Sequence, residues 1–519
     1  MKNKIPLKNI RFGKTDAFNE LKEYGTEWFK KAFFNYEKYN IDDFIEGRKY
    51  YICGDKGSGK TSFLRYLQCE LQEDMNNLII PIRFKSEIDE LDRRSIIIAA
   101  NNVEEISAEG INDFKSNDSA VLVWCVYIIN KFFEIYQEKG EFAFFHDNQE
   151  FSEIQKLLKI VYPRKENTIL PKIKHGQLTI ETKALKLLDA KLCLDLDVDK
   201  SAKKANVNFI KIGKSIINKF AKLEYDRNRA YIIFDELELS VHSKKDNKRD
   251  IKLVRDLILA IDKLNEICKE NGFDIHLIAS VRNEVIRSVY TTGFEINKCI
   301  EDYGTVITWN QRTGSFSNNS LLNILENKII ASEIEYGITN HGDIWNKYFE
   351  PTINNTDVRK YILEYTWMHP RDIVRLMNNV QENCSSTDEL FTQEAFDKAL
   401  KAYSKASWNE MSEELILKYN SEDIKTIKAV FNNIKVPFNL KILNERIDQL
   451  SHIDSNVDKL LKKHQLIDIL KDLFELGIIG NSGQRMIFKF LGDDELALIE
   501  DMIIHKPLRN FFAVKSRNT

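Results

Sequence analysis

Gly54-Asp55-Lys56-Gly57-Ser58-Gly59-Lys60-Thr61 is the stretch of this chain that decides its fold. It has the pattern G-x-x-x-x-G-K-[ST], it follows the apolar residues 50–53, and it precedes the helix-like residues 62–67. A strand, a glycine-rich loop and a helix in this order form a phosphate-binding loop. The glycines let successive N–H groups point at phosphate oxygens, and the helix adds its positive N-terminal dipole. The stretch therefore predicts a nucleoside triphosphate site.

Two side chains of this loop have specific roles in the prediction. Lys60 would reach the β- and γ-phosphates, and the Thr61 hydroxyl would be a ligand of Mg²⁺. We expect ATP and Mg²⁺ as the bound groups, in contact with all residues from Gly54 to Ser62. The alternative is an ordinary turn rich in glycine and serine, which the strand and helix on either side disfavour.

The bulk composition limits the class of protein. A chain of 519 residues predicts two to four domains, and 43% hydrophobic residues can form substantial cores. A net charge of -3 gives no overall field that would attract nucleic acid or a membrane. Seven dispersed cysteines without a C-x-x-C pair favour reduced thiols over disulfides or a zinc site.

The apolar segments give no sign of export or membrane insertion. The first residues have no apolar core of the kind found in signal peptides. The longest apolar run, 121–129, is far shorter than the roughly 20 residues that span a bilayer, so it predicts a buried core segment. We therefore expect a soluble cytoplasmic protein without a membrane partner.

A second half of the nucleotide site is predicted far downstream of the loop. Residues 230–234 form an apolar strand that ends in Asp235 and Glu236. Asp235 would hold Mg²⁺ together with Thr61, and Glu236 would act as general base towards the attacking water. An acidic pair that opens a solvated turn after a strand is the alternative. Beside a phosphate-binding loop, the catalytic interpretation is favoured.

Two further segments place polar residues next to apolar elements. Residues 251–270 have helical spacing, and 275–280 predict the next buried strand, whose end carries Ser280, Arg282 and Asn283. Later, Pro370-Arg371-Asp372 begins an amphipathic helix, as a proline in the first turn favours. Surface polarity at a strand end and an exposed Arg371–Asp372 pair are the alternative interpretations.

Taken together, these segments resemble a group of bacterial P-loop ATPases of AAA+/STAND type, which are related at fold level to origin-recognition ATPases. The resemblance spans most of the chain and rests on short motifs: Phe12-Gly13, Lys56 to Thr61, Asp235-Glu236, Arg282, Asn297-Lys298, Trp309, Pro370 to Asp372, and His505 to Arg509. Two positions depart from the pattern, because His369 stands where an arginine is expected and Lys506 interrupts a His-Pro pair.

The resemblance implies a fold and several site residues. The fold is an α/β P-loop NTPase, an αβα sandwich with a large insertion, a helical lid and a C-terminal winged-helix-like domain. Ser280, Arg282 or Asn283 would sense the γ-phosphate, and Arg371 would act as a second sensor from the lid. We expect a homo-oligomer, because such sites usually borrow an arginine from a neighbour, here Arg282 or Arg287. The predicted catalytic set is Lys60, Asp235, Glu236, Arg282 and Arg371.

The motifs also divide the chain. Residues 1–49 would form a helical lead-in that in AAA+ proteins contacts the base; then follow the ATPase core at 50–310, the lid at 311–408 and the winged-helix-like domain at 409–519. The core carries a basic insertion at about 100–225, with 16 Lys/Arg against 6 Asp/Glu between residues 156 and 222. This excess suits a nucleic-acid backbone, and a solvated lysine-rich hairpin and helix explains it at least as well. Strands are expected at 192–198 and 207–212.

The C-terminal segment has the pattern of a winged helix. Helices are predicted at 423–434, 439–450 and 464–476, followed by a hairpin of 478–480 and 486–490. In a winged helix that binds DNA, the third helix enters the major groove. The exposed side of this helix is close to neutral, since it carries Asp468, Lys471, Asp472 and Glu475. Groove binding and a protein-docking or autoinhibitory role are both consistent with the sequence.

These observations lead to two hypotheses about function. The first is an ATP-hydrolysing switch that acts on DNA or RNA, for which the resemblance implies a role in antiviral defence. The second is an ATP-gated sensor or scaffold that controls a separate operon-encoded effector without binding nucleic acid. ABC-type ATPases are disfavoured by the absence of any Gly-Gly pair, and small GTPases because the acidic strand lies about 175 residues after the glycine-rich loop. No His/Cys cluster supports a metal-dependent effector within the chain.

Overall fold

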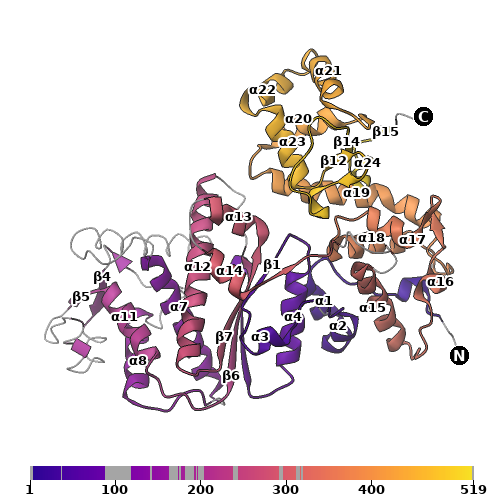
Figure 1. The fold of residues 1–519 in the computed structure, drawn as a ribbon. Helices are drawn as coiled ribbons and strands as arrows, with labels where there is room; N and C mark the ends of the chain where they lie inside the picture. Colours follow the sequence, from indigo (N-terminus) through magenta and orange to yellow (C-terminus); the bar gives the residue numbers. More distant parts are fainter. Residues whose placement is uncertain are drawn as a thin grey trace.

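Figure 1 shows the computed structural model of the chain. The structure describes residues 4–36, 38–87, 118–140, 143–162, 173–174, 177–181, 192–193, 196, 204–237, 244–291, 296–310, 316 and 319–516. Within these residues the protein is a mixed α/β structure with a central parallel sheet, a set of helices that follows it in the chain, and a separate C-terminal part.

The central sheet has five strands among the described residues. Their order is β2 (Asn77–Arg83), β6 (Arg229–Leu237), β7 (Ile275–Arg282), β1 (Tyr51–Gly54) and β8 (Gly304–Ile307). Every neighbouring pair is parallel, so all carboxyl ends lie at one edge of the sheet. This order places β7 between β1, which leads into the glycine-rich loop, and β6, which carries the acidic pair.

Helices cover both faces of the sheet, as a parallel sheet requires. Alternate residues of β1 show the two faces, since Tyr51 and Cys53 belong to one hydrophobic core and Ile52 to another. The second core includes α4 (Lys60–Leu71) and helices of the lid. The first includes α7 (Asp118–Lys139), α8 (Gln149–Val161), α11 (Phe209–Phe220) and α12 (Lys244–Glu270).

Helix α7 is long and apolar enough to cross a membrane by length and composition alone. It is a core helix of this fold, because 72% of its most apolar window is buried, Trp124 is fully buried, and α7 packs against α12. The prediction of a buried core segment at 121–129 is confirmed, although the helix extends well beyond it. No other helix in the described ranges passes the same test.

The insertion between β2 and β6 holds a small antiparallel sheet of β3 (Ile173–Lys174), β4 (Gln177–Glu181) and β5 (Lys204–Asn208). The predicted strand at 207–212 is wrong beyond Asn208, because α11 begins at Phe209. The Asn208 side chain accepts a hydrogen bond from the Ile210 N–H at 2.8 Å and so caps the helix. Most of the predicted strand at 192–198 lies outside the described residues, and Leu192 and Cys193 are helical.

The N-terminal lead-in joins the core to the lid. Its helical part comprises α1 (Ala17–Tyr24), α2 (Thr26–Ala32) and α3 (Asp42–Ile45). The residues before α1 pack on the lid instead, where the backbone N–H of Ile5 donates to the Tyr348 hydroxyl and that of Arg11 to Ser332. The lid helices are α15 (Ser320–Glu335), α16 (Ile344–Tyr348), α17 (Val358–Glu364), α18 (Pro370–Glu382) and α19 (Gln393–Leu415).

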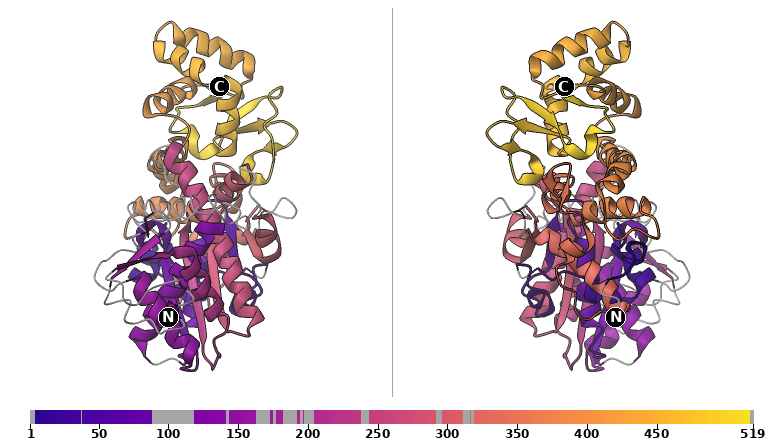
Figure 2. Two further views of the ribbon diagram at one scale, coloured as in Figure 1. Left: turned by 90° about the vertical axis from the view of Figure 1, so that its left-hand side faces the viewer. Right: turned by 90° about the vertical axis from the view of Figure 1, so that its right-hand side faces the viewer.

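The residues after α19, called the tail below (residues 416–516), have their own hydrophobic core. Its helices are α20 (Ser421–Phe431), α21 (Leu440–Ser451), α22 (Ser455–Lys463) and α23 (Leu466–Glu475). An antiparallel sheet of β12 (Ile479–Ser482), β13 (Met486–Ile487) and β14 (Met502–Ile504) follows, then α24 (Lys506–Arg509). The three predicted helices are present, and α22 was missed. Figures 1 and 2 show the tail at one end of the molecule, with α19 leading into it.

Candidate functional site

The glycine-rich loop connects β1 to α4 at the carboxyl edge of the sheet. Gly57 and Gly59 adopt positive φ angles of 83° and 99°, which residues with a side chain rarely adopt. A Cβ atom on Gly57 would also lie 3.3 Å from Cβ of Arg371 on α18. Ser58 N–H donates to the Asp55 carbonyl at 3.2 Å, and this bond closes the turn. The loop is therefore curled, and it packs directly against the start of a lid helix.

Lys60 is buried at the start of α4. Its Nζ donates to the carbonyl oxygens of Gly54 at 2.9 Å and Asp55 at 2.8 Å, so the side chain folds back along the loop. Burial, and then the positive charge of Arg282, lower the pKa of Lys60 to about 8 against the opposing effect of nearby carboxylates. The amine thus lies in a confined position where an anion would stabilise its charge.

Asp235 is the point where three elements meet. Its buried Oδ1 accepts hydrogen bonds from Ser280 Oγ of β7 at 2.6 Å and from the N–H of Glu236 at 2.9 Å. Thr61 Oγ1 of α4 donates to the same oxygen at 3.4 Å. The structure therefore brings together the predicted residues of the loop, the acidic pair and the β7 strand end.

Glu236 has a different environment from Asp235. Its φ angle of 61° is left-handed, and it lies at an irregularity in the pairing of β6 with β7. Glu236 Oε1 accepts from Arg83 Nε at 3.0 Å and Nη2 at 2.8 Å, and Oε2 accepts from Ser86 Oγ at 2.6 Å. Arg83 ends β2 opposite Asp235 in the strand register. The sequence analysis missed Arg83 and Ser86, although an arginine at the end of an apolar strand was visible.

The remaining candidates on β7 and α13 (Asn283–Thr291) also lie near the loop. Asn283 Nδ2 donates to Asp55 Oδ1 at 2.9 Å. Arg282 pairs with Glu284 at 3.1 Å, and Arg287 lies 3.7 Å from the Asp55 carboxylate. The polar end of this strand is thus directed at the loop, which argues against simple surface polarity.

Arg371 lies against the loop from the lid side. Its N–H donates to the Gly57 carbonyl at 3.4 Å, and its Nη1 pairs with Glu410 of α19 at 2.8 Å. The alternative of an exposed Arg371–Asp372 pair is wrong, because Asp372 is buried and accepts the Trp367 N–H at 2.9 Å. Arg371 is therefore directed at the junction of loop and lid.

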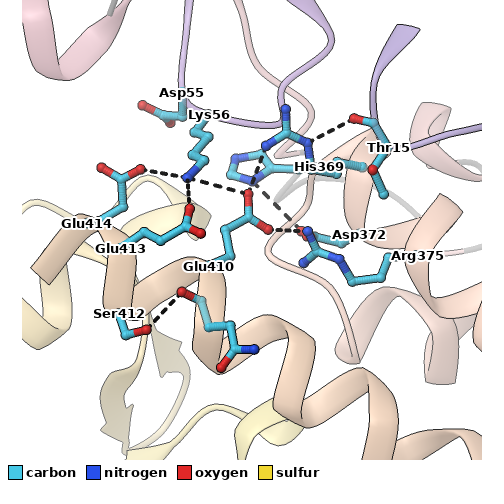
Figure 3. Close-up of polar contacts among 12 residues, drawn as sticks. Thr15, Asp55, Lys56, His369, Asp372, Arg375, Glu410, Ser412, Glu413 and Glu414 are labelled. Carbon is cyan, nitrogen blue, oxygen red and sulfur yellow. Dashed lines mark hydrogen bonds and ion pairs between the residues drawn. The ribbon is translucent and has the colours of Figure 1, made fainter. Parts of the chain in front are cut away.

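An acidic surface on α19 was not predicted. Figure 3 shows Lys56 of the loop directed at Glu410, Glu413 and Glu414, with Nζ–Oε distances of 3.9, 3.5 and 2.9 Å. Glu410 also pairs with Arg375. Burial alone would raise the pKa of Glu410, and the charges of Arg375, Arg371 and Lys56 outweigh it and lower this pKa to about 2. No sequence motif marks these residues, because they are separated from the loop by more than 350 positions.

A cavity of about 230 Å³ extends from the loop towards the lead-in. Its walls include Lys60, Thr61 and Asp235 at one part and aromatic residues at another, namely Phe29, Phe33, Phe34, Tyr36, Tyr39 and Trp309. Trp309 Nε1 donates to the Ser58 carbonyl at 2.8 Å, which fixes this aromatic wall to the loop. The site therefore combines a polar, cationic region with an apolar aromatic one.

Comparison with known proteins identifies one segment of the chain. Residues 319–412 match the family model of a FunZ-associated C-terminal helical domain. The match covers α15 to most of α19, and it leaves the central sheet, the glycine-rich loop and the tail outside. No curated protein matches the chain.

Proposed function

We propose that this chain is a P-loop ATPase that binds ATP with Mg²⁺ and hydrolyses it at the carboxyl edge of its central sheet. One observation carries the proposal. Thr61 Oγ1, directly after the glycine-rich loop, lies 3.4 Å from Asp235 Oδ1, although the two residues are 174 positions apart. A hydroxyl and a carboxylate in this arrangement are oxygen ligands suited to Mg²⁺ beside a nucleotide.

The loop residues fit a triphosphate. The left-handed Gly57 and Gly59 permit a curl whose N–H groups can face phosphate oxygens, and α4 adds its N-terminal dipole. Ser58 Oγ is buried and has no hydrogen-bond partner among the described residues, so it is available to a ligand. Lys60 and the loop N–H groups would hold the phosphates, and Thr61 and Asp235 would hold the ion.

The other residues of the edge fit hydrolysis. Glu236 would take a proton from the attacking water once its carboxylate is released from Arg83. Ser280 and Asn283 would orient the water and the γ-phosphate, and Lys60 and Arg282 would stabilise the negative charge of the transition state. Bound Mg²⁺ would supply additional positive charge at the phosphate oxygens.

The aromatic wall fits the base of the nucleotide. Tyr36 stacks on Trp309 with ring centroids 5.6 Å apart, and both line the same cavity as Lys60. Aromatic rings provide flat apolar faces against which a purine stacks. This supports the expectation that the lead-in contacts the base.

A broader assignment to the AAA+/STAND type, with an αβα sandwich and a winged-helix-like tail, is part of the proposal. The strand order supports it by placing Ser280 between the loop and the acidic pair. Self-association remains a prediction of the resemblance. Arg282 and Arg287 both lie near the loop of their own chain, which favours a role in the same subunit for each.

We consider two candidate partners for the ATPase, a nucleic acid and a separate effector protein. The basic insertion supports DNA or RNA, and the FunZ-associated match supports an effector-linked or defence context. The alternative, a sensor or scaffold for a separate effector, has one specific observation in its favour. On α23, Asp472 pairs with Lys418 and Glu475 with Arg287, so this side of the helix is engaged within the chain.

The test of the proposed function is equilibrium binding of ATP with Mg²⁺ by calorimetry. We expect Lys60→Ala to abolish tight binding, because the variant lacks the buried amine that would contact the phosphates. Lys22→Ala, on the exposed side of α1, is the matched control and should bind like the wild type. Equal binding by wild type and Lys60→Ala would contradict the proposal.

A further inference from the structure

We propose that Glu410, Glu413 and Glu414 of α19 form an acidic clasp that competes with a triphosphate for the cations of the loop and lid. In this device, nucleotide binding weakens the attachment of α19, and the tail that follows α19 changes its position. The inference rests on the proposed function, because it requires a triphosphate at the loop.

The clasp residues lie on one side of α19, since positions three and four apart in a helix are neighbours. From there they reach Lys56, whose Nζ is 2.9 Å from Glu414 and 3.5 Å from Glu413 (Figure 3). Lys56 is itself part of the glycine-rich loop. The clasp therefore contacts the segment that would surround the phosphates.

The same carboxylates pair with cations from two other elements. Glu410 contacts Arg371 of α18 at 2.8 Å and also pairs with Arg375. Glu414 lies 3.7 Å from Arg282 at the end of β7. Arg282 and Arg371 are the two arginines expected to contact the γ-phosphate. Loop, strand end and lid thus all direct a cation at one set of carboxylates.

Most of these charges are partly shielded from solvent, and Glu413 is the exception, with a side chain that is 69% exposed. The side chains of Glu410, Arg375 and Arg282 are only 13–14% exposed, and that of Lys56 is 22% exposed. Coulomb interactions of partly buried charges are screened less than those on the surface. A triphosphate brings several negative charges to the same cations, so the clasp and the ligand oppose each other.

Helix α19 transmits the competition to the tail. Near its end, Trp408 stacks on Phe511 with ring centroids 5.4 Å apart and also contacts Phe512. The residues just before α18 also contact the tail, because Trp367 Nε1 donates a hydrogen bond to the Gly477 carbonyl at 3.0 Å. A displacement of α19 therefore moves the tail relative to the sheet. The coupling is reciprocal. If nucleotide binding weakens the attachment of the tail by some factor, then a partner that holds the tail in place weakens nucleotide binding by that same factor.

The experiment uses the double variant Glu413→Gln/Glu414→Gln, which removes two charges and keeps the buried Glu410–Arg375 pair. Glu394→Gln is the matched control, since it lies in the first turn of the same helix and pairs only with Lys398 among the described contacts. Dissociation constants for ATP with Mg²⁺ are measured by calorimetry. We expect the double variant to bind about three- to tenfold more tightly, because it loses the ion pairs of Glu413 and Glu414 with Lys56 and of Glu414 with Arg282.

A distance measurement reports on the tail. Spin labels are placed on Met75→Cys in the core and Ile453→Cys in the tail, which are 92% and 84% exposed, while all seven native cysteines are buried. In the wild type, ATP should shift the distance distribution. The double variant should show part of this shift without nucleotide, and Glu394→Gln should match the wild type.

The outcomes separate the two claims. If the wild type binds ATP but the double variant has the same affinity and the same distances, the clasp is overturned and the ATPase proposal stands. If the wild type binds no ATP at all, both are overturned, since the clasp then has no competitor.

Discussion

Glu236 is held by hydrogen bonds from Arg83 and Ser86, so both of its carboxylate oxygens are engaged. A general base must instead accept a proton from water. Arg83 is also fixed from the other side, because its guanidinium lies 4.7 Å from the centre of the Phe18 ring in the lead-in. In the proposed mechanism, Arg83 and the attacking water would therefore compete for the Glu236 carboxylate.

Replacement of Arg83 tests this competition. We expect Arg83→Ala to raise the rate constant of ATP hydrolysis by about fivefold, which corresponds to the loss of an opposing ion pair worth about 1 kcal/mol. The dissociation constant for ATP should not change. Steady-state phosphate release measures the effect, and a rate as low as that of a variant without the Glu236 carboxylate would show that Arg83 positions the base.

At the residue scale, the sequence predicted the groups that lie in motifs. The loop, Asp235 and the polar end of β7 come together because parallel strands end at one edge, a rule that needs no side-chain detail. Arg83 and the clasp on α19 were missed for a physical reason. Their partners are set by strand register and by packing between distant segments, and neither leaves a local pattern in the sequence.

At the element scale, α19 brings three carboxylates, Glu410, Glu413 and Glu414, to the cations of the loop and the lid. Glu410 lies between Arg371 and Arg375, and its carboxylate is largely buried. The lowered pKa of about 2 means that the folded protein holds this group in its charged form more strongly than the unfolded chain does. The stabilisation from Glu410 is therefore fully present above pH 4.5 and is lost as the pH falls from about 4.5 towards 2.

The direction of this pH dependence predicts how Glu410→Gln changes the stability of the protein. The shift from the ordinary value of 4.5 to about 2 corresponds to roughly 3 kcal/mol of stability at pH 7. We expect the variant to have a lower thermal midpoint than the wild type at pH 7, with a gap that narrows below pH 4.5. Circular dichroism melts over a pH series measure it, with Glu394→Gln as control. A difference in thermal midpoint between the wild type and Glu410→Gln that does not change with pH would contradict a lowered pKa of Glu410.

The elements that the sequence predicted less well share a cause. Residues 207–212 alternate in polarity over a short stretch, which predicted a strand. The Asn208 side chain instead caps α11, so the helix begins at Phe209. Helix α22 has its own cap, since Asp454 accepts the Asn456 N–H at 2.9 Å, but only a few apolar residues mark it. Short segments are decided by single capping contacts, which periodicity does not reveal.

At the scale of the whole molecule, the tail is attached to the core and the lid by specific contacts. Arg287 of α13 pairs with Glu475 of α23 at 3.1 Å, and Lys506 of α24 pairs with Glu364 of α17. His505, beside Lys506, is buried among Trp367, Phe488 and Phe490, and burial lowers its pKa well below the ordinary value. This joint is therefore largely aromatic at its centre, and it places the tail next to Trp367, which precedes α18.

Nucleic-acid binding is tested at this scale. The exposed Lys211 and Lys214 of α11 belong to the basic insertion. If the insertion holds a phosphate backbone, we expect duplex DNA to stimulate hydrolysis, and about six contacts would lose roughly a thousandfold in affinity between 50 and 200 mM salt. Lys211→Glu/Lys214→Glu should weaken binding, and Lys22→Glu should not. The absence of both stimulation and salt dependence would favour the sensor or scaffold alternative.

The most direct test of the account compares wild type and Glu236→Gln in two assays of the same preparations, ATP binding by calorimetry and single-turnover hydrolysis with Mg²⁺. The substitution keeps the size of the side chain and removes only the base, so the loop and Asp235 should still hold the nucleotide. We predict ordinary affinity for ATP in both proteins and hydrolysis in the wild type alone. Hydrolysis by Glu236→Gln at the wild-type rate would contradict the account.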